Sequence, residues 1–243
     1  MQLKRLQHYF GEFERFLRKQ EATDRLYIWE SQVIFQENWN NEATDWALMY
    51  DQSLQNSTSR RLWKREAFEP KRLMLLFLEM EPEYVKQAFR DLFNEEKSVD
   101  GRMDRFVFYC DELLRMYRER HPHSIENNHY HGNDYDMISL YLTFRFPADY
   151  VPYDLGRLIK LLRTLGVGQL PQANDPVRYF KVARTLNKLM QKEVAILERH
   201  RERIDQNGQH ECPGSLLLVH DFMSYLTEDR YESAGLRQPY RDR

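Results

Sequence analysis

The sequence predicts an all-α protein that folds as a single compact domain of about ten helices. Apolar side chains recur three and four residues apart along nearly the whole chain, which is the period of a helix with one buried face. No stretch alternates apolar and polar residues between hairpin turns, so no sheet is expected. Aromatic residues make up 14% of the chain, and such bulky side chains fill the gaps between packed helices.

In the first half of the chain, breakers divide this pattern into short helices. Pro70 and Pro82 each open a helix, because proline suits the first helical turn, where its missing N–H would have no partner. Thr44 is the expected cap of a short helix that carries Trp46. In order, the expected helices cover residues 3–18, 24–39, 44–50, 70–80, 82–93 and 102–120.

In the second half, a polar segment at 121–133 interrupts the pattern and marks the place where two lobes would divide. Asp175-Pro176 combines an N-cap with a first-turn proline and opens the longest helical pattern, which continues towards Ile204. In order, the expected helices cover residues 134–144, 152–165, 176–204 and 216–226.

Length and charge set the broad class. The 243 residues suit one large helical domain, which we place at residues 1–228, followed by a polar tail or linker at 229–243. The net charge is −2. Dedicated nucleic-acid-binding proteins usually carry a basic excess, so the whole-chain balance argues against that class but leaves room for a local basic patch.

We expect a soluble, cytoplasmic protein that does not span a membrane. The N-terminus passes directly into an amphipathic pattern without the apolar core of a signal peptide. The longest apolar run, at 73–78, is far short of the roughly 20 residues that a membrane span needs. Cys110 and Cys212 are expected to be unpaired thiols in a reducing compartment.

Four histidines lie within eleven residues of the polar segment, at His121, His123, His129 and His131. Imidazole is a common zinc ligand, so their density suggests a metal site. The segment has no cysteine, however, and its histidines follow no recognised ligand spacing. The alternative is a polar loop in which His129 and Tyr130 anchor the chain to the following helix. We expect this loop, and the sequence assigns no metal site and no cofactor.

The doublet His220-Asp221 is typical of helical metal-dependent phosphohydrolases, which also need an earlier histidine and a later aspartate at the metal. Only Asp229 follows the doublet at a short distance. We therefore expect both residues on the solvent side of the last helix, and the hydrolase stays as an alternative. The sequence has no G-x-x-x-x-G-K-[ST] phosphate loop and no G-x-G-x-x-G, so nucleotide hydrolysis is not expected.

Basic side chains recur every three or four residues after Pro176 and would line one face of the long helix. Between residues 176 and 203, eight basic residues face three acidic ones, a local charge of +5. Such a stripe suits a nucleic-acid backbone, an acidic partner or a solvated surface, and these interpretations stay open. The candidate binding residues are Arg178, Lys181, Arg184, Lys188 and Lys192, followed by Arg199, Arg201 and Arg203.

Aromatic residues near the N-terminus could stack on a base or form a cage. Their helical spacing instead favours packing in the core. These residues are Trp29, Phe35, Trp39 and Trp46.

Several strings of this chain resemble one protein family. They are residues 29–39 (WESQVIFQENW), 70–71 (PK), 89–96 (FRDLFNEE), 128–130 (NHY) and 138–147 (ISLYLTFRFP). Together, over about residues 5–228, they resemble the helical N-terminal region that precedes the AAA+ GTPase module in modification-dependent (McrBC-type) bacterial restriction proteins. The resemblance implies a non-catalytic module that selects the target, while the GTPase module and a nuclease subunit act on DNA. No catalytic residue carries over.

The expected function is therefore a non-enzymatic recognition or interaction module of a bacterial restriction or phage-defence system. Its basic helix face would contact DNA or a partner, and the implied partners are the AAA+ GTPase module or the nuclease subunit. One alternative is a purely structural protein–protein assembly domain. The other is the phosphohydrolase built on His220 and Asp221.

Overall fold

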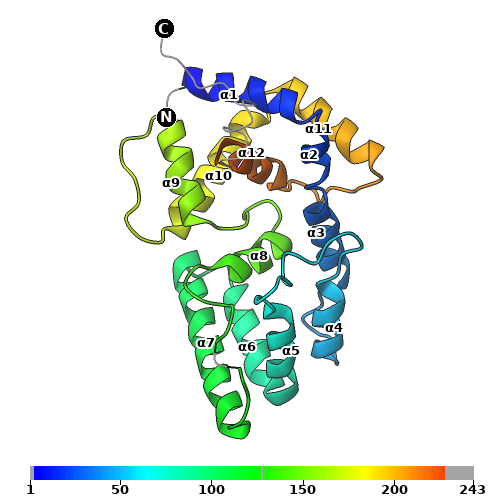
Figure 1. Ribbon diagram of the computed structural model, residues 1–243, viewed down its shortest axis with the longest axis vertical. Helices are drawn as coiled ribbons and strands as arrows, with labels where there is room; N and C mark the ends of the chain where they lie inside the picture. Colours follow the sequence, from blue (N-terminus) through cyan, green and yellow to red (C-terminus); the bar gives the residue numbers. More distant parts are fainter. Residues whose placement is uncertain (1–2, 127, 228–243) are drawn as a thin grey trace.

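The computed structural model describes residues 3–126 and 128–227, and within these ranges every regular element is a helix. The predicted all-α class is confirmed (Figure 1). The helices in chain order are α1 (Leu3–Phe16), α2 (Gln20–Thr23), α3 (Tyr27–Asn38), α4 (Trp46–Ser53), α5 (Pro70–Met80), α6 (Pro82–Leu92), α7 (Val99–Arg120), α8 (Asp136–Arg145), α9 (Leu155–Thr164), α10 (Pro176–Met190), α11 (Val194–Gln206) and α12 (Leu217–Thr227).

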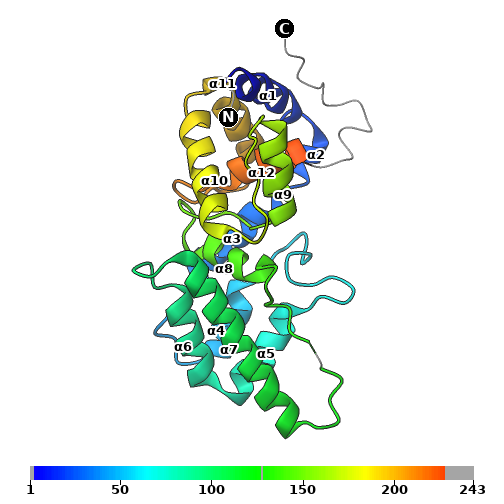
Figure 2. The ribbon, with the colours of Figure 1, turned by 90° about the vertical axis from the view of Figure 1, so that its left-hand side faces the viewer.

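The helices form two groups along the long axis of the molecule, with α3 and α8 between them (Figure 1). One group holds α4 to α7, in which α5 packs on α4 and α6, and α6 packs on α7. The other group holds α1 and α9 to α12. There α12 packs against α1, α9 and α10 (Figure 2). The first and last described helices therefore lie at the same end of the molecule.

The core between the two groups is built from aromatic rings, as the sequence predicted. The ring of Phe89 on α6 lies 5.0 Å from Trp39, 5.1 Å from Phe106 and 5.1 Å from Tyr141, measured between ring centroids. These contacts join helices α6, α7 and α8 and the end of α3. The four N-terminal aromatics are all buried and serve core packing, as expected: Trp29, Phe35, Trp39 and Trp46.

One buried amide ties three segments together where the groups meet. Gln32 on α3 is fully buried, and its Nε2 donates to the Thr143 carbonyl oxygen near the end of α8 at 2.8 Å. Its Oε1 accepts from Ser215 Oγ, just before α12, also at 2.8 Å. The oxygen and the nitrogen of this amide therefore both bond to distant parts of the chain, as buried polar atoms normally must.

Several helix starts lie where the sequence placed them. Pro70, Pro82 and Pro176 each occupy the first turn of a helix. The cap of α4 differs, because Asp45 rather than Thr44 accepts the free N–H, from Leu48 at 2.9 Å. A carboxylate satisfies the same orphan donor as a threonine hydroxyl and also faces the positive end of the helix dipole.

The prediction of one long helix from 176 to 204 is wrong. The segment forms two helices, α10 and α11, separated by a turn at Gln191–Glu193 in which Glu193 has a non-helical backbone. The turn lets α10 pack on α12 and α11 on α1, which one straight helix could not do. Lys192 consequently lies beyond the end of α10 and outside its regular face.

Within the described residues, no helix combines the length and apolar character needed to cross a membrane. The predicted tail at 229–243 lies outside the described residues, so the division between domain and tail stays a prediction. Both cysteines, Cys110 and Cys212, are free and buried, as expected.

Candidate anion-binding site

The segment that holds α9 and α10 carries a large positive surplus. From residue 154 to residue 192 the sequence has eight basic and two acidic residues, a surplus of six charges. Because the whole chain carries −2, the remainder of the chain carries −8. The charge of this protein is therefore strongly segregated, which the whole-chain value conceals.

Both acidic residues of this segment are engaged at helix starts. Asp154 Oδ1 accepts the backbone N–H of Arg157 at 2.8 Å, and Asp175 Oδ1 accepts that of Arg178 at 3.0 Å. Each carboxylate thus caps a helix, α9 or α10, and faces the partial positive charge of that helix end. Asp154 Oδ2 also lies 3.9 Å from Arg157 Nη2, and the segment keeps its surplus of six positive charges.

The structure brings four of the five predicted stripe residues together on α10. Arg178 and Arg184 are partly buried and donate to backbone carbonyls, of Gln169 at 2.6 Å and of Asp149 at 2.8 Å. Lys181 and Lys188 are exposed, and among the described residues no acidic side chain pairs with either. The two lysines are the cations of this face that an outside ligand can reach.

The predicted extension of the stripe into residues 199–203 is partly wrong. Arg201 is exposed, but Arg199 pairs with Glu14 at 3.2 Å and with Glu202 at 2.6 Å. Arg203 is 3% exposed, so it belongs to the interior rather than to a basic face.

A basic pocket lies beside α9, on the side where α9 and α12 approach the start of α3. It has a volume of about 650 Å³, within the range of ordinary ligand pockets. Four basic side chains and one acidic side chain line it. The lining residues are Arg25, Tyr27, Ile28, Arg61, Arg157, Lys160, His220, Asp221, Ser224 and Thr227.

The one acidic residue of the pocket is already paired. Asp221 is 2% exposed, and its Oδ2 lies 2.9 Å from Arg203 Nη1, while Oδ1 lies 3.8 Å from Arg25 Nη1. The expectation that Asp221 lies on the solvent side of α12 is therefore wrong, whereas His220 is half-buried and lines the pocket. Helix α12 is apolar around most of its circumference, and most of such a helix is buried.

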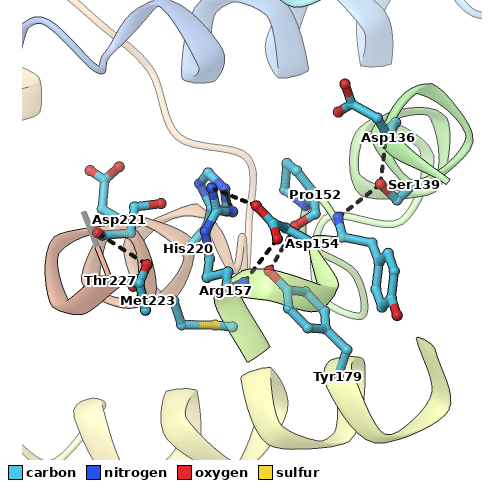
Figure 3. Close-up of polar contacts among 12 residues, drawn as sticks. Asp136, Ser139, Pro152, Asp154, Arg157, Tyr179, His220, Asp221, Met223 and Thr227 are labelled. Carbon is cyan, nitrogen blue, oxygen red and sulfur yellow. Dashed lines mark hydrogen bonds and ion pairs between the residues drawn. The ribbon is translucent and has the colours of Figure 1, made fainter. Parts of the chain in front are cut away.

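The segment before α9 is held on both sides, which fixes the position of Arg157 (Figure 3). The backbone N–H of Tyr153 donates to Ser139 Oγ of α8 at 2.8 Å. Tyr179 of α10 donates its hydroxyl hydrogen to the Pro152 carbonyl oxygen at 2.9 Å. Helix α9 thus begins between α8 and α10 at a defined place.

His220 and Arg157 meet across the gap between α12 and α9 (Figure 3). Arg157 Nη1 lies 2.7 Å from His220 Nε2. A guanidinium group only donates, so Nε2 accepts and the imidazole proton sits on Nδ1. Burial, and then the positive charges of Arg157 and Arg25, hold the pKa of His220 well below its usual range. The ring is neutral, with an N–H at Nδ1.

Among the described residues, His220 Nδ1 and Ser224 Oγ are buried polar atoms of pocket residues that have no hydrogen-bond partner. Buried polar groups normally bond, so each such atom calls for an explanation. Both can donate a hydrogen bond, and both belong to side chains that line a cavity rich in cations. The basic lining of the pocket suits an anion.

The histidines of the polar segment do not form one cluster. His121 stacks on Tyr117 of α7, and among all four histidines only His129 and His131 are brought together. The prediction that His129 anchors the loop to the following helix is wrong, because His129 bonds Asp111 of the preceding helix α7 at 2.7 Å. His131 is the residue that contacts the following helix, through Tyr141 of α8 at 3.0 Å.

Sequence reasoning missed the basic pocket because its lining comes from four distant segments. One local signal was present. Arg157, Lys160 and Arg163 recur three residues apart on α9 and repeat the spacing that revealed the α10 face. No comparable signal marks Arg25 or Arg61.

Comparison with known proteins gives no relative: no family model matches the chain, and neither a curated protein nor a solved structure matches it.

Proposed function

We propose that this protein is a non-catalytic recognition module that binds DNA through the basic surface of α9 and α10. A backbone phosphate would occupy the pocket between α3, α9 and α12. The observation that carries the proposal is the donor set of that pocket. Four cationic side chains line the pocket, and two further lining residues carry buried donors, His220 Nδ1 and Ser224 Oγ, that have no hydrogen-bond partner among the described residues.

Phosphate suits this donor set better than a neutral ligand does. A phosphate group accepts several hydrogen bonds at once and carries the charge that the surrounding guanidinium groups attract. Arg61 also lies over the ring of Tyr27, with its guanidinium carbon 4.1 Å from the ring centroid. An aromatic ring beside a phosphate site offers a nucleotide base a surface for stacking.

The α10 lysines would extend the contact along the polymer. Lys181 and Lys188 lie seven residues apart, or about 10 Å along the helix axis, and both are exposed on the side opposite the core. Each phosphate that a lysine neutralises releases counterions, which makes the affinity depend on salt. This segregated surface supports DNA binding in spite of the net charge of −2.

We further propose a place for this module in bacterial restriction or phage defence. The resemblance of residues 29–39 and 138–147 to the N-terminal region of McrBC-type proteins supports it. An AAA+ GTPase module or a nuclease subunit would then supply the catalysis. The state of the His220-Asp221 doublet supports a non-catalytic role here, because arginines hold both side chains where a metal ion would be needed.

A salt titration of DNA binding tests the proposal. Fluorescence anisotropy of a labelled duplex would be measured with wild type and with Lys181→Glu plus Lys188→Glu. We expect the double variant to bind more weakly, and the slope of log affinity against log salt to become shallower by about 2. The matched control is Arg105→Glu plus Arg115→Glu on α7, which changes the charge equally and should leave the slope unchanged.

The pocket itself is tested by Ser224→Ala. This change removes a donor and no charge, so we expect weaker binding with the same salt slope. If folded wild-type protein fails to bind DNA at low salt, or if the α7 control weakens binding as much as the α10 variant, the proposal is wrong.

One feature favours the alternative of a protein–protein assembly domain. An apolar groove of about 540 Å³ lies between α9 and α10 and is lined by Leu162, Leu165 and Val182, among others. Val177 at its edge is 47% exposed. Because Arg178 and Lys181 flank it, the groove suits an acidic amphipathic helix. Under this alternative, Val177→Asp would weaken assembly while the protein bound no DNA at any salt concentration.

A further inference from the structure

Three potential metal ligands meet where the loop after α7 folds back on that helix. Cys110 is on α7, and His129 and His131 are on the loop that leads to α8. One ligand atom from each lies within 4.8 Å of the other two. Cys110 and His131 are fully buried and His129 is 8% exposed. This is the one such group of three among the residues that the structure describes.

The Nε2 nitrogen of each imidazole has a hydrogen-bond partner. His129 Nε2 lies 2.7 Å from Asp111 Oδ1, and His131 Nε2 lies 3.0 Å from the Tyr141 hydroxyl. An ionised carboxylate only accepts, so His129 carries its proton on Nε2 and presents a lone pair at Nδ1. A histidine that binds a metal through one nitrogen commonly donates from the other to a carboxylate in this way.

The Nδ1 nitrogens of both rings are poorly satisfied without a ligand. His131 Nδ1 is buried and has no hydrogen-bond partner among the described residues. His129 Nδ1 accepts only the backbone N–H of His131, at a long 3.2 Å. A buried nitrogen with no partner is costly and rare in folded proteins. The unpartnered atom here belongs to the ring that the neighbouring thiol and imidazole approach.

We propose that Cys110, His129 and His131 bind a zinc ion, and that this ion fastens the loop between α7 and α8 to α7. Thiolate sulfur and imidazole nitrogen are the donors that zinc prefers. In a tetrahedral site with ordinary bond lengths, donor atoms lie about 3.3–3.8 Å apart. The three donors therefore need to approach one another by about 1.5 Å at most, which side-chain rotation can supply.

The charges of the site balance when zinc is bound. On binding, the Cys110 thiol releases its proton to solvent, and the resulting thiolate and the Asp111 carboxylate together neutralise the two charges of the ion. The hydrogen bond that His129 Nδ1 accepts from the backbone is replaced by a coordinate bond. Three protein ligands leave the fourth position to water, which keeps the ion exchangeable.

The first experiment measures zinc binding by the full chain. The protein would be stripped with a chelator and dialysed, and then titrated with zinc against a chromophoric chelator. We expect one ion per chain and a higher melting temperature with zinc than without it. Cobalt in place of zinc should show a thiolate-to-cobalt charge-transfer band, which shows that a cysteine sulfur is a ligand.

Variants then assign the ligands. Cys110→Ala and His131→Gln should lose zinc binding and, for Cys110→Ala, the cobalt band. Cys212→Ala is the matched control, because Cys212 is the other buried free cysteine, and His123→Gln controls for the remaining loop histidines. Both controls should bind as wild type does, and circular dichroism confirms that each variant is folded.

Asp111 is expected to be a positioning residue. Asp111→Asn should weaken zinc affinity by about 10–100-fold while the thiolate-to-cobalt band remains. Glu112→Gln, one residue along α7, should change neither. The proposal is overturned if folded wild type takes up no zinc or cobalt, if the cobalt spectrum lacks the thiolate band, or if Cys110→Ala binds as well as Cys212→Ala.

Discussion

Arg203 of α11 and Asp221 of α12 form an ion pair inside the protein, with Nη1 and Oδ2 2.9 Å apart and both side chains 2% exposed. Arg203 also donates to the carbonyl oxygen of Ala22 in α2 at 3.0 Å. Arg25 approaches the same carboxylate from the other side at 3.8 Å. One aspartate thus balances two guanidinium groups where α11 and α12 meet the N-terminal helices.

Asp221→Asn should destabilise the protein strongly. Removing the carboxylate charge leaves Arg203 and Arg25 without compensation in a buried site, and breaking a buried pair in this way costs about 3–5 kcal/mol. The free energy of unfolding, measured by chemical denaturation, should fall by that amount. Arg203→Met combined with Asp221→Leu should cost less, because the buried charge of Arg203 is then removed together with that of Asp221.

The control for this prediction is Glu119→Gln in the exposed pair Arg115–Glu119, whose side chains are 55% and 63% exposed. That change should leave the unfolding free energy nearly unchanged, since exposed pairs contribute little. Equal effects of Asp221→Asn and Glu119→Gln would contradict the assignment of a buried pair.

Stability should fall as the pH drops below about 6.5. Burial and nearby arginines hold the pKa of His220 well below its usual range, and burial with the neighbouring His129 lowers that of His131 to about 3. Above pH 6.5 both rings are neutral in the folded and the unfolded chain, so they add no pH dependence. Below it the unfolded chain takes up protons that the folded chain refuses, which favours unfolding.

The slope that each histidine contributes is at most about 1.4 kcal/mol per pH unit. Denaturation curves of metal-free protein between pH 7.5 and about 5 would measure it. His220→Gln keeps an acceptor for Arg157 and cannot titrate, so its curve should be flatter than that of wild type. A curve with the same slope in both proteins would show that His220 titrates normally in the folded state.

Phe89→Ala should be among the most damaging single changes in the core. The ring of Phe89 contacts aromatic rings from α3, α7 and α8, so truncation opens a cavity that these rigid side chains cannot fill. The expected loss is about 3–5 kcal/mol of unfolding free energy, read from thermal or chemical denaturation. Phe108→Ala is the matched control, because Phe108 is 57% exposed on α7. Its effect should stay within about 0.5 kcal/mol.

The fold was largely predictable because helix periodicity and proline are local signals. Pro70, Pro82 and Pro176 marked three helix starts correctly. The break between α10 and α11 was missed because Gln191–Glu193 contains no glycine or proline. What separates these helices is their packing: α10 lies on α12, whereas His200 of α11 lies against Trp29. Such contacts between distant residues give no signal in the local sequence.

The candidate sites were less predictable. Periodicity revealed the basic face of α10. Burial, however, decides which of the predicted basic side chains are exposed, and Arg203 is buried. The apolar residues around Asp221 could have indicated that α12 is buried and that its aspartate must have a basic partner. The histidine-rich segment was visible, whereas Cys110 lies 19 residues before His129 and became a neighbour only through the turn of the chain after α7.

The buried amide of Gln32 has a mechanical consequence. Its two hydrogen bonds reach α8 and the residues before α12 from a single side chain on α3. Bending the molecule between its two groups of helices would stretch both hydrogen bonds at once, in a buried place that water does not reach. A force applied to the surface of α9 and α10 should therefore displace the group of helices α4 to α7 as well, because the two groups move together as one rigid body.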